Sequence, residues 1–441
     1  MANIPTLESM LTGSFHTAPL STGVVPKKDK LKFMLVSTHC QQYTGYSKVS
    51  YGIINELAKV PWLDVIHFGF QKFPNLKIQD GYRTYPPHVK IIDVAPMENP
   101  LEQGFGFKIL PSVIATAEPD IVMIYNDMSV VSNFINEFDK AGMKKTFKLW
   151  VYVDQVYPIQ LKGYLDLLNL RAERIFTFTP YWKKCLKDQG VTRPMDVILH
   201  GFDSHIYKRM DRKDIRKLMN IPEDAFVYLN LNRNQPRKRY DIMVMAFVEL
   251  VVKYPTKPVY LLCICDKGDK GGWWIFEIFQ RELQLRGVPF EPFATRIMLT
   301  SADMVFPDEQ INAFYNVANV GVNSADGEGW GLCNFEQMGI GIPQVVPNVG
   351  GFKEFCNASN SVLVEPSIRS YLPTVFSPVG GETNEMNPHD LCLGMEEYLL
   401  DSEKLDKHGE EARKTVLTYT WSRAVEQLVR RLTQARDDMD D

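Results

Sequence analysis

Short apolar runs recur along the first half of the chain, and several are followed by a stretch with apolar residues at helical spacing. A run such as LKFMLVST is short enough to be a central buried strand. Strands that alternate with helices at this spacing predict a parallel, doubly wound sheet with right-handed crossovers. The predicted strands cover residues 31–38, 63–70, 88–95, 119–127, 147–154, 173–180 and 195–201, and the predicted helices cover residues 47–60, 129–142, 159–173 and 181–190.

A second set of the same kind follows a polar, charged stretch at residues 200–214. The fold class is therefore α/β, with two Rossmann-like doubly wound units: residues 31–205 and residues 206–420, after a loosely ordered lead over residues 1–30. Residues 367–388 are rich in Pro, Ser and Gly and are expected to form an extended loop, and the tail after them is expected to be helical. The predicted strands of the second unit cover residues 225–232, 257–265, 319–323 and 343–347, and its helices include residues 240–254 and 273–287.

The stretch from Asn323 to Glu354 joins a predicted strand, a Gly-rich turn, a helix start and another strand: NSADGEGWGLCNFEQMGIGIPQVVPNVGGFKE. Ligands of open α/β sheets bind at the carboxyl ends of the strands, where this turn would lie. A helix that opens near Gly331 would present free N–H groups and its positive dipole end, which favours a phosphate. Glu328 and Glu336 could accept hydrogen bonds from the hydroxyls of a sugar and a ribose. The alternative is an ordinary strand–helix turn with two surface glutamates.

A basic turn, RNQPRKRYD, begins where the first strand of the second unit ends. Arg233 and Lys238 could clamp a diphosphate there and stabilise negative charge on a leaving phosphate. Their neighbours Arg237 and Arg239 are expected to face solvent. The alternatives are a solvated basic turn and a nucleic-acid contact, but the run lacks the interleaved aromatic residues and the basic domain of the latter.

The loop after the first predicted strand, HCQQYTGYSK, holds a single glycine, Gly45. The dinucleotide-binding fingerprint G-x-G-x-x-G is absent, which disfavours a nicotinamide-dependent Rossmann enzyme. Gly45 could let the backbone approach a phosphate, or it could serve only as a turn glycine.

Composition narrows the class of protein further. A chain of 441 residues is too long for one ordinary core, in agreement with two domains. The formal net charge of -4 gives no reason to expect a nucleic acid or an anionic membrane as partner. No apolar run approaches the ~20 residues needed to span a bilayer, and the N-terminus lacks a secretory signal pattern. The seven scattered cysteines lack zinc spacing and are expected to be free thiols. These features predict a soluble, cytoplasmic protein with no transmembrane segment.

Four segments together resemble the retaining glycosyltransferases of family four, the "glycosyl transferases, group 1" type with the GT-B fold. They are HGFDSHIY, RNQPRKRYD, FPDEQINAFYNVANVGVNSADGEGWGL and GIPQVVPNVGGFKEF. The resemblance is strong over residues 195–360 and only in outline over residues 31–195. It implies two Rossmann-like domains that face a cleft, with the acceptor on the first and the nucleotide-sugar donor on the second. It also implies that a C-terminal helix, residues 421–441, packs back on the first domain.

The resemblance assigns roles to individual residues. It implies that Arg233 and Lys238 bind the donor diphosphate and support its departure. Glu328, with the backbone of Gly329 and Trp330, would hold the transferred sugar. Three further roles follow from it: Gly331 and Leu332 would meet the phosphates through backbone amides, Glu336 would take the ribose hydroxyls, and Gly45 would face the diphosphate from the first domain.

The chain departs from the family pattern at several positions. Arg239 stands where a glycine usually follows the lysine, and Asn319 stands where an aspartate is common. His200 replaces an asparagine and Trp330 a phenylalanine. Many members place a histidine at the end of a first-domain strand, but WVYVDQVYP offers only Asp154. Asp154 either contacts the acceptor or the sugar, or it caps the next segment.

The implied activity is transfer of a sugar, with retention, from a nucleotide-sugar such as a UDP- or GDP-sugar to a glycan, lipid-linked or protein-linked acceptor. The resemblance implies neither a cofactor nor a metal, since Arg and Lys neutralise the leaving group. The alternatives are a nucleotide-sugar epimerase or phosphorylase on the same architecture and a non-catalytic binding protein. A DNA-modifying glucosyltransferase is a further possibility, which the acidic composition opposes.

Overall fold

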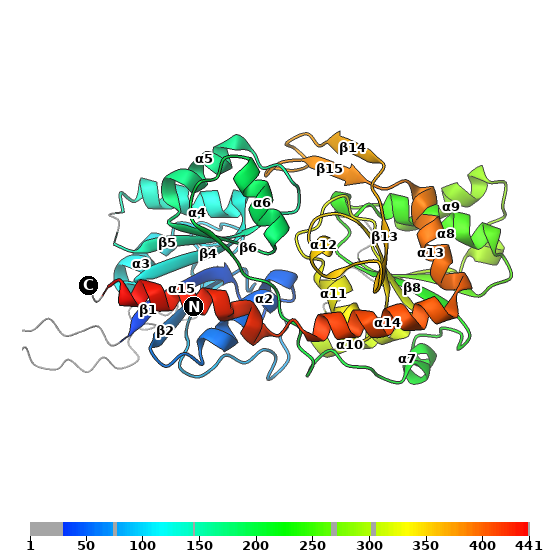
Figure 1. Ribbon diagram of the computed structural model, residues 1–441, viewed down its shortest axis with the longest axis horizontal. Coiled ribbons are helices and arrows are strands. Elements are labelled where there is room, and N and C mark those ends of the chain that lie inside the picture. The colour runs from blue at the N-terminus through cyan, green and yellow to red at the C-terminus, as the bar shows by residue number, and fades with distance from the viewer. Residues whose placement is uncertain (1–29, 74–76, 144–145, 266–270, 301–305, 440–441) are drawn as a thin grey trace, which may run out of the picture.

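The computed structural model describes residues 30–73, 77–143, 146–265, 271–300 and 306–439. Two α/β domains lie side by side, each built round its own parallel sheet (Figure 1). The lead predicted over residues 1–30 lies outside the described residues except for its last residue. None of the helices in the described ranges is both long and apolar enough to cross a bilayer.

The first domain holds a seven-stranded sheet of order β3-β2-β1-β4-β5-β6-β7, and its strands pair in parallel. Its strands are β1 (Leu31–Thr38), β2 (Leu63–Phe70), β3 (Lys90–Asp93), β4 (Ile121–Asp127), β5 (Lys148–Asp154), β6 (Arg174–Thr177) and β7 (Met195–Val197). Its helices are α2 (Gly45–Leu57), η1 (Ala95–Met97), α3 (Leu110–Ala117), α4 (Met128–Lys140), α5 (Lys162–Arg171) and α6 (Pro180–Asp188).

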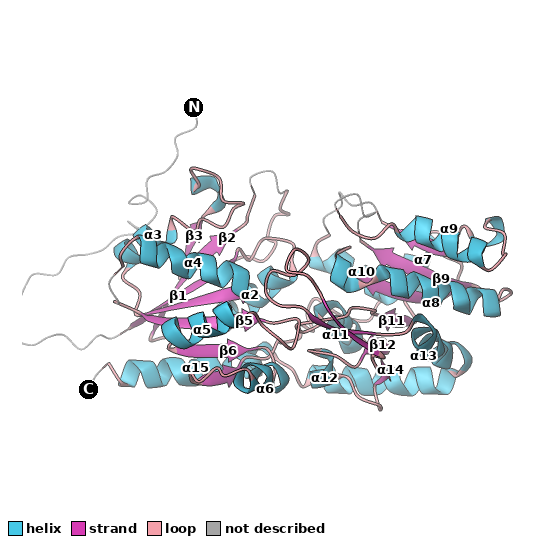
Figure 2. Ribbon diagram, turned by 90° about the horizontal axis from the view of Figure 1, so that it is seen from above, coloured by secondary structure: helices cyan, strands magenta, loops and turns pink. Residues whose placement is uncertain are grey.

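Strand β1 shows why these apolar runs are continuous rather than alternating. Phe33 and Leu35 belong to the same buried cluster as residues of α2, whereas Met34 and Val36 belong to the cluster that contains residues of α3 and α4. Successive side chains of a strand point to opposite faces of its sheet, so both faces of this sheet are covered by helices. Figure 2 shows the helices arranged around the strands of each domain.

The second domain repeats the plan with a six-stranded parallel sheet of order β10-β9-β8-β11-β12-β13. Its strands are β8 (Phe226–Leu231), β9 (Val259–Ile264), β10 (Ile297–Leu299), β11 (Val320–Val322), β12 (Gln344–Pro347) and β13 (Ser361–Val364). Its helices are α7 (Arg212–Leu218), η2 (Pro236–Lys238), α8 (Tyr240–Lys253), α9 (Ile275–Leu285), η3 (Glu291–Phe293), α10 (Asp308–Val317), α11 (Leu332–Gly339), α12 (Phe352–Phe355), α13 (Pro388–Leu400) and α14 (Ser402–Leu417).

The prediction of an extended loop over residues 367–388 is wrong. This segment contains an antiparallel hairpin of β14 (Ile368–Tyr371) and β15 (Glu382–Glu385). Its strands, IRSY and ETNE, are short and mostly polar, so they carry no alternation of apolar residues that would indicate a sheet. The edge strands β10 and β13, which sequence reasoning also missed, are only three and four residues long.

The last helix, α15 (Trp421–Asp437), lies along the first domain, while α14 before it lies in the second domain (Figure 1). Trp421 packs on α2 so closely that a Cβ atom at Gly52 would overlap the indole ring. Ala424, Leu428 and Leu432 of α15 are buried. The chain therefore passes between the domains after β7 and again before α15, whereas the exact domain boundaries at residues 205 and 420 stay predictions.

Candidate functional site

A cleft of about 1040 Å³ lies between the domains, and both sheets contribute the loops at the carboxyl ends of their central strands. In each sheet the strand order reverses beside the first strand, at β1/β4 and at β8/β11. Such switch points open a crevice in which ligands of open α/β sheets bind. The cleft is therefore the place where the two switch points face one another, and most of the predicted site residues line it.

The basic turn of the second domain supplies a buried ion pair. Lys238, at the end of η2, is 6% exposed, and its ammonium group donates to the Glu328 carboxylate. Burial, with the nearby Arg237 charge, lowers the pKa of Lys238 to about 8. Burial alone would raise the pKa of Glu328, but Lys238 and Arg237 outweigh it and hold this pKa below its usual value. The structure thus brings together two predicted residues that are 90 positions apart.

Arg233 also lines the cleft, and it is exposed. Within the described ranges no carboxylate forms an ion pair with it, so its guanidinium group is open to an anion. The two neighbouring arginines were predicted to face solvent, and that prediction is wrong. Arg237 donates to the Gly327 carbonyl at 3.0 Å and lies 3.6 Å from Glu328, while Arg239 pairs with Asp241 at 2.9 Å and with Glu385.

The tight turn at Pro236–Lys238 explains the direction of these side chains. A 3₁₀-helix rotates successive residues by about 120°, and Arg239 after it adopts a left-handed backbone with φ of 47°. Arg237 therefore reaches the cleft floor, while Arg239 reaches the base of the β14–β15 hairpin. Arg237 is a site residue that sequence reasoning missed, although the run RKR at a strand end already carried the signal.

The Gly-rich turn requires its glycines. Gly331 adopts φ of 91° as the N-cap of α11, and a Cβ atom there would overlap the Phe352 ring. A Cβ atom at Gly329 would overlap Oδ1 of Asp154 from the other domain. Leu332 opens α11 at the cleft, where the first N–H groups of the helix lack intrahelical partners. The turn therefore offers an anion-binding helix start.

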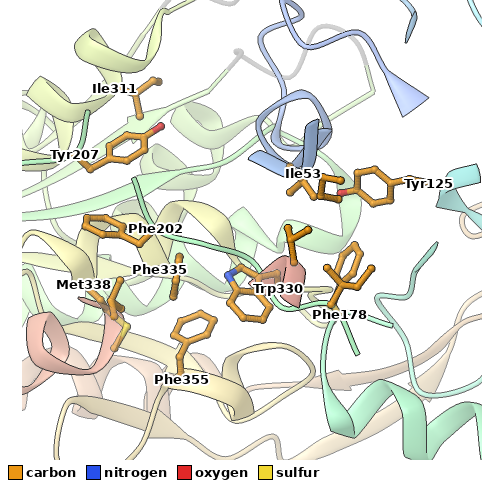
Figure 3. Packing of buried hydrophobic residues seen from close by; sticks show 14 of the residues in the cluster. Ile53, Tyr125, Phe178, Phe202, Tyr207, Ile311, Trp330, Phe335, Met338 and Phe355 are labelled. Carbon is orange, nitrogen blue, oxygen red and sulfur yellow. The ribbon is translucent and has the colours of Figure 1, made fainter. Parts of the chain in front are cut away.

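Trp330 anchors this turn in an aromatic cluster (Figure 3). Its ring centroid lies 5.2 Å from that of Phe335 and 5.3 Å from that of Phe355. On the first-domain side, His200 lies 4.7 Å from Trp330 and 4.5 Å from Phe178. The indole N–H and both imidazole nitrogens are buried and have no hydrogen-bond partner among the described residues, and both side chains line the cleft. Burial lowers the pKa of His200 to about 3, so its ring is neutral at physiological pH.

Glu336 lies behind the cleft rather than on its wall. It is buried in α11, and both of its carboxylate oxygens accept from Lys48 of α2, at 2.8 and 2.9 Å. The Tyr315 hydroxyl donates to the same carboxylate at 2.6 Å. A ribose would have to replace Lys48 in order to donate to this group, and the ribose role of Glu336 stays a prediction. Sequence reasoning missed Lys48, although it lies only three positions after Gly45, at the start of the helix predicted after that loop.

Gly45 is the first residue of α2, where the Thr44 hydroxyl caps the helix by accepting from the Ser47 N–H. A Cβ atom at Gly45 would lie 3.1 Å from Cδ1 of Leu332. The starts of α2 and α11 therefore approach each other across the cleft. Two helix starts with their positive dipole ends at one place favour an anion between them.

Asp154 ends β5 and faces the second domain. Its Oδ2 accepts from the Tyr46 hydroxyl at 2.5 Å, and its Oδ1 is buried with no hydrogen-bond partner in the part of the chain that the structure describes. Burial raises the pKa of Asp154 to about 6, although the Tyr46 hydrogen bond opposes this shift. In the described ranges the side chain makes no hydrogen bond to the segment that follows it, and its contact with an acceptor or a sugar stays a prediction.

Comparison with known proteins identifies the second domain. Residues 211–371 match the family model of glycosyl transferases group 1. The match covers all six strands of the second sheet. The resemblance found in the motifs is thereby confirmed. Over 204 residues the chain is 24% identical to the D-inositol 3-phosphate glycosyltransferase of Streptosporangium roseum, a match that spans 44% of this chain and only 44% of that relative.

Solved structures extend the likeness to the whole glycosyltransferase fold. Sucrose-phosphate synthase from Thermosynechococcus elongatus superposes with a TM-score of 0.67 at 17% identity, over 92% of this chain and 100% of that one. HepE from Anabaena, solved in complex with UDP-glucose, superposes with a TM-score of 0.66 at 14% identity, over 92% and 100% of the two chains. The predicted fold class, two Rossmann-like domains facing a cleft in the GT-B architecture, is confirmed.

Proposed function

We propose that the protein is a retaining glycosyltransferase that moves a sugar from a UDP- or GDP-sugar to a hydroxyl of a glycan, lipid-linked or protein-linked acceptor. The observation that carries this proposal is the cluster of Arg233, Arg237 and the Lys238–Glu328 pair at the carboxyl edge of the second sheet. Cations that could hold a diphosphate lie there beside a carboxylate that could accept from sugar hydroxyls, within the segment that matches the glycosyl transferases group 1 model, and this supports the proposal.

The reaction breaks the bond between the anomeric carbon and the diphosphate oxygen, and it forms a bond from the same carbon to the acceptor oxygen. Retention follows when the acceptor attacks from the face that the diphosphate leaves, and its hydroxyl proton passes to the departing phosphate oxygen. Arg233 and Lys238 stabilise the negative charge that develops there, together with the start of α11. Such preorganised charges contribute most in a site that excludes water, because little reorganisation is needed as the reaction proceeds.

Glu328, with the backbone of Gly329 and Trp330, holds the transferred sugar in this proposal. Glu328 is 7% exposed and lines the cleft, so a sugar hydroxyl that donates to it replaces little bound water. The neighbour HepE was solved with UDP-glucose, which supports a nucleotide-sugar donor for this chain as well. Metal independence and a cytoplasmic location are parts of the proposal, and transfer assays with and without EDTA test the first of them.

The experiment is a thermal-shift screen of the purified protein against UDP, GDP, ADP and their sugar conjugates. A ligand at 100 times its dissociation constant stabilises the native state by about 2.7 kcal/mol. We expect one nucleotide to raise the melting temperature, and Arg233→Ala and Glu336→Ala to abolish that rise. Arg281→Ala, an exposed arginine of α9, is the matched control and should keep the full shift.

The alternatives predict different products. A transferase forms a new glycoside and free nucleoside diphosphate, an epimerase returns an altered nucleotide-sugar, and a binding protein consumes no donor. If no nucleotide changes the melting temperature, with or without Mg²⁺, the donor site is misassigned and the proposal fails.

A further inference from the structure

Two carboxylates line the first-domain wall of the cleft. The second-domain wall presents cations together with carboxylates: Arg233, Arg237, Lys238 and Arg239, and Asp308, Asp326, Glu328 and Glu385. The first-domain wall presents Asp127 and Asp154, which end the neighbouring strands β4 and β5 and are direct partners in the register of that pair. The carboxylates therefore lie next to each other at the carboxyl edge of the first sheet, opposite the diphosphate-binding wall.

The cations of the first-domain wall are already engaged. Among its described lining residues only Lys48 and Arg83 carry a positive charge. Arg83 binds Asp308 of α10 through two hydrogen bonds of 2.9 Å, with both side chains almost fully buried. Lys48 binds Glu336 at 2.8 Å. Both charges are thus neutralised by carboxylates of the second domain, and neither is available to a ligand.

The remaining groups near the first-domain wall are neutral. His200 and Trp330 line the cleft with buried nitrogens that have no hydrogen-bond partner in the described ranges, as noted above. A neutral imidazole can donate one hydrogen bond and accept another, and an indole N–H can donate one. Aromatic side chains that can pack against the apolar C–H face of a sugar ring complete this side: Tyr43, Tyr46, Tyr82, Phe105, Tyr125, Tyr157 and Phe178.

We infer that the acceptor is an uncharged sugar, whose hydroxyls donate to Asp127 and Asp154 while its ring packs on the aromatic residues, and that phosphorylated sugars are rejected. A phosphate dianion at this wall would face two carboxylates, whereas both cations of the first-domain wall are already paired, and like charges in a partly desolvated cleft repel strongly. A hydroxyl, in contrast, can donate a hydrogen bond to a carboxylate. This inference rests on the proposed glycosyltransferase function and specifies its acceptor.

The test measures nucleotide release from the donor that the thermal-shift screen identifies. Acceptors are offered as matched pairs: glucose and glucose 6-phosphate, mannose and mannose 6-phosphate, and maltose and maltose 1-phosphate. We expect the kcat/KM of the uncharged member to exceed that of its phosphorylated partner at least tenfold. Asp127→Asn keeps the N-cap of α4 but removes one charge, so it should narrow this ratio by lowering the KM for the phosphorylated member.

Asp166→Asn, an exposed aspartate of α5 that does not line the cleft, is the matched control and should leave the ratio unchanged. A phosphorylated sugar that is used as well as its parent, or better, would overturn the inference while leaving the glycosyltransferase function intact. Failure of every uncharged sugar on an enzyme that still binds the nucleotide would also overturn it. If no nucleotide binds, the proposed function fails first, and the inference falls with it.

Discussion

At the residue scale, the Lys238–Glu328 pair is the feature most closely tied to the proposed chemistry. Both side chains are more than 90% buried, and each holds the other in place. A buried ion pair contributes little net stability, but it is costly to break on one side. The proposed function gives this pair its role at the cleft, because net stability alone does not account for it.

The first prediction concerns this pair. Glu328→Gln keeps the shape of the side chain and a hydrogen-bond acceptor for Lys238, but it leaves the buried Lys238 charge uncompensated, so it should lower the melting temperature. Loss of the charged contact to the sugar should lower kcat by about 10²- to 10³-fold, the range seen when one preorganised group is removed. Steady-state transfer kinetics and the melting temperature check this result. Lys162→Ala, on the surface of α5, should change neither.

The second prediction is a bell-shaped dependence of kcat/KM on pH. The pKa of Asp154 is raised to about 6, so its carboxylate gains a proton below that pH. The protonated group no longer accepts hydrogen bonds from hydroxyls at both of its oxygens. Lys238, with its pKa lowered to about 8, loses its charge above that pH. Activity should therefore fall on both sides of pH 7. Lys238→Arg should remove the alkaline limb, because arginine stays charged, and an unchanged limb would contradict the assignment.

The third prediction concerns stability at the same residue. Because burial raises the folded-state pKa of Asp154 above its unfolded value, the native state binds this proton more tightly. This tighter proton binding stabilises the native state below about pH 4, and the stabilisation is lost as the pH rises toward 6. Asp154→Asn should thus be more stable than the parent at pH 7, by on the order of 1 to 3 kcal/mol. Denaturant unfolding at pH 4 and pH 7 measures this difference, which should shrink at the lower pH.

At the element scale, α15 ties the end of the chain to the first domain. Trp421 packs where Gly52 of α2 leaves room, and a larger residue there would force the two helices apart. The β14–β15 hairpin makes a second link, since the Val379 carbonyl at its far end accepts from the Leu161 N–H at 2.9 Å in the first domain. Arg239 pairs with Glu385 at the base of the hairpin.

The fourth prediction tests the contact between α2 and α15. Gly52→Ala should lower the melting temperature, with a cost of about 1–3 kcal/mol for overpacking against Trp421. Gly163→Ala is the control, because Gly163 also lies in a helix but has open space around its Cβ position. Alanine at this control site should be neutral or stabilising. Equal effects of the two substitutions would show that the helix contact is unimportant.

At the scale of the whole molecule, buried ion pairs hold the two domains together across the cleft. Arg83 and Asp308 come from different domains and are 3% and 5% exposed. Tyr207, in the segment that links the domains, donates to Asp308 at 3.2 Å, so the pair is built into a larger polar network. This network joins the two domains beside the cleft.

The fifth prediction removes one side of the buried pair. Asp308→Asn leaves the Arg83 charge uncompensated, so it should destabilise the closed form by about 3–5 kcal/mol and open the cleft. Small-angle X-ray scattering should show a larger radius of gyration, and transfer should slow because water enters the site. Asp139→Asn breaks the exposed pair with Arg171 and should cost no more than about 1 kcal/mol. An unchanged radius of gyration would contradict a role for this pair in closure.

The amino-acid sequence alone is enough to predict the central strands of both sheets and the two motifs that face the cleft. Buried strands of a parallel sheet are continuous apolar runs, so β1, β4, β5 and β8 are visible without tertiary information. The Gly-rich turn at Gly331 and the basic turn at Arg233 are also local patterns, because their backbone requirements and charges lie within a few residues. Edge strands and the polar hairpin lack such a pattern, and the sequence left them unpredicted.

The groups that meet across the cleft become known only from the packing of the two domains. Lys48 reaches Glu336 over 288 positions, and Arg83 reaches Asp308 over 225. Arg237 faces the cleft because of the backbone path through η2, not because of its neighbours in the sequence. Spacing along a chain constrains local conformation, whereas the partner of a charge depends on how the two sheets pack. Burial favours pairing of a cation with a carboxylate, and the cations that stay unpaired remain available to bind an anion.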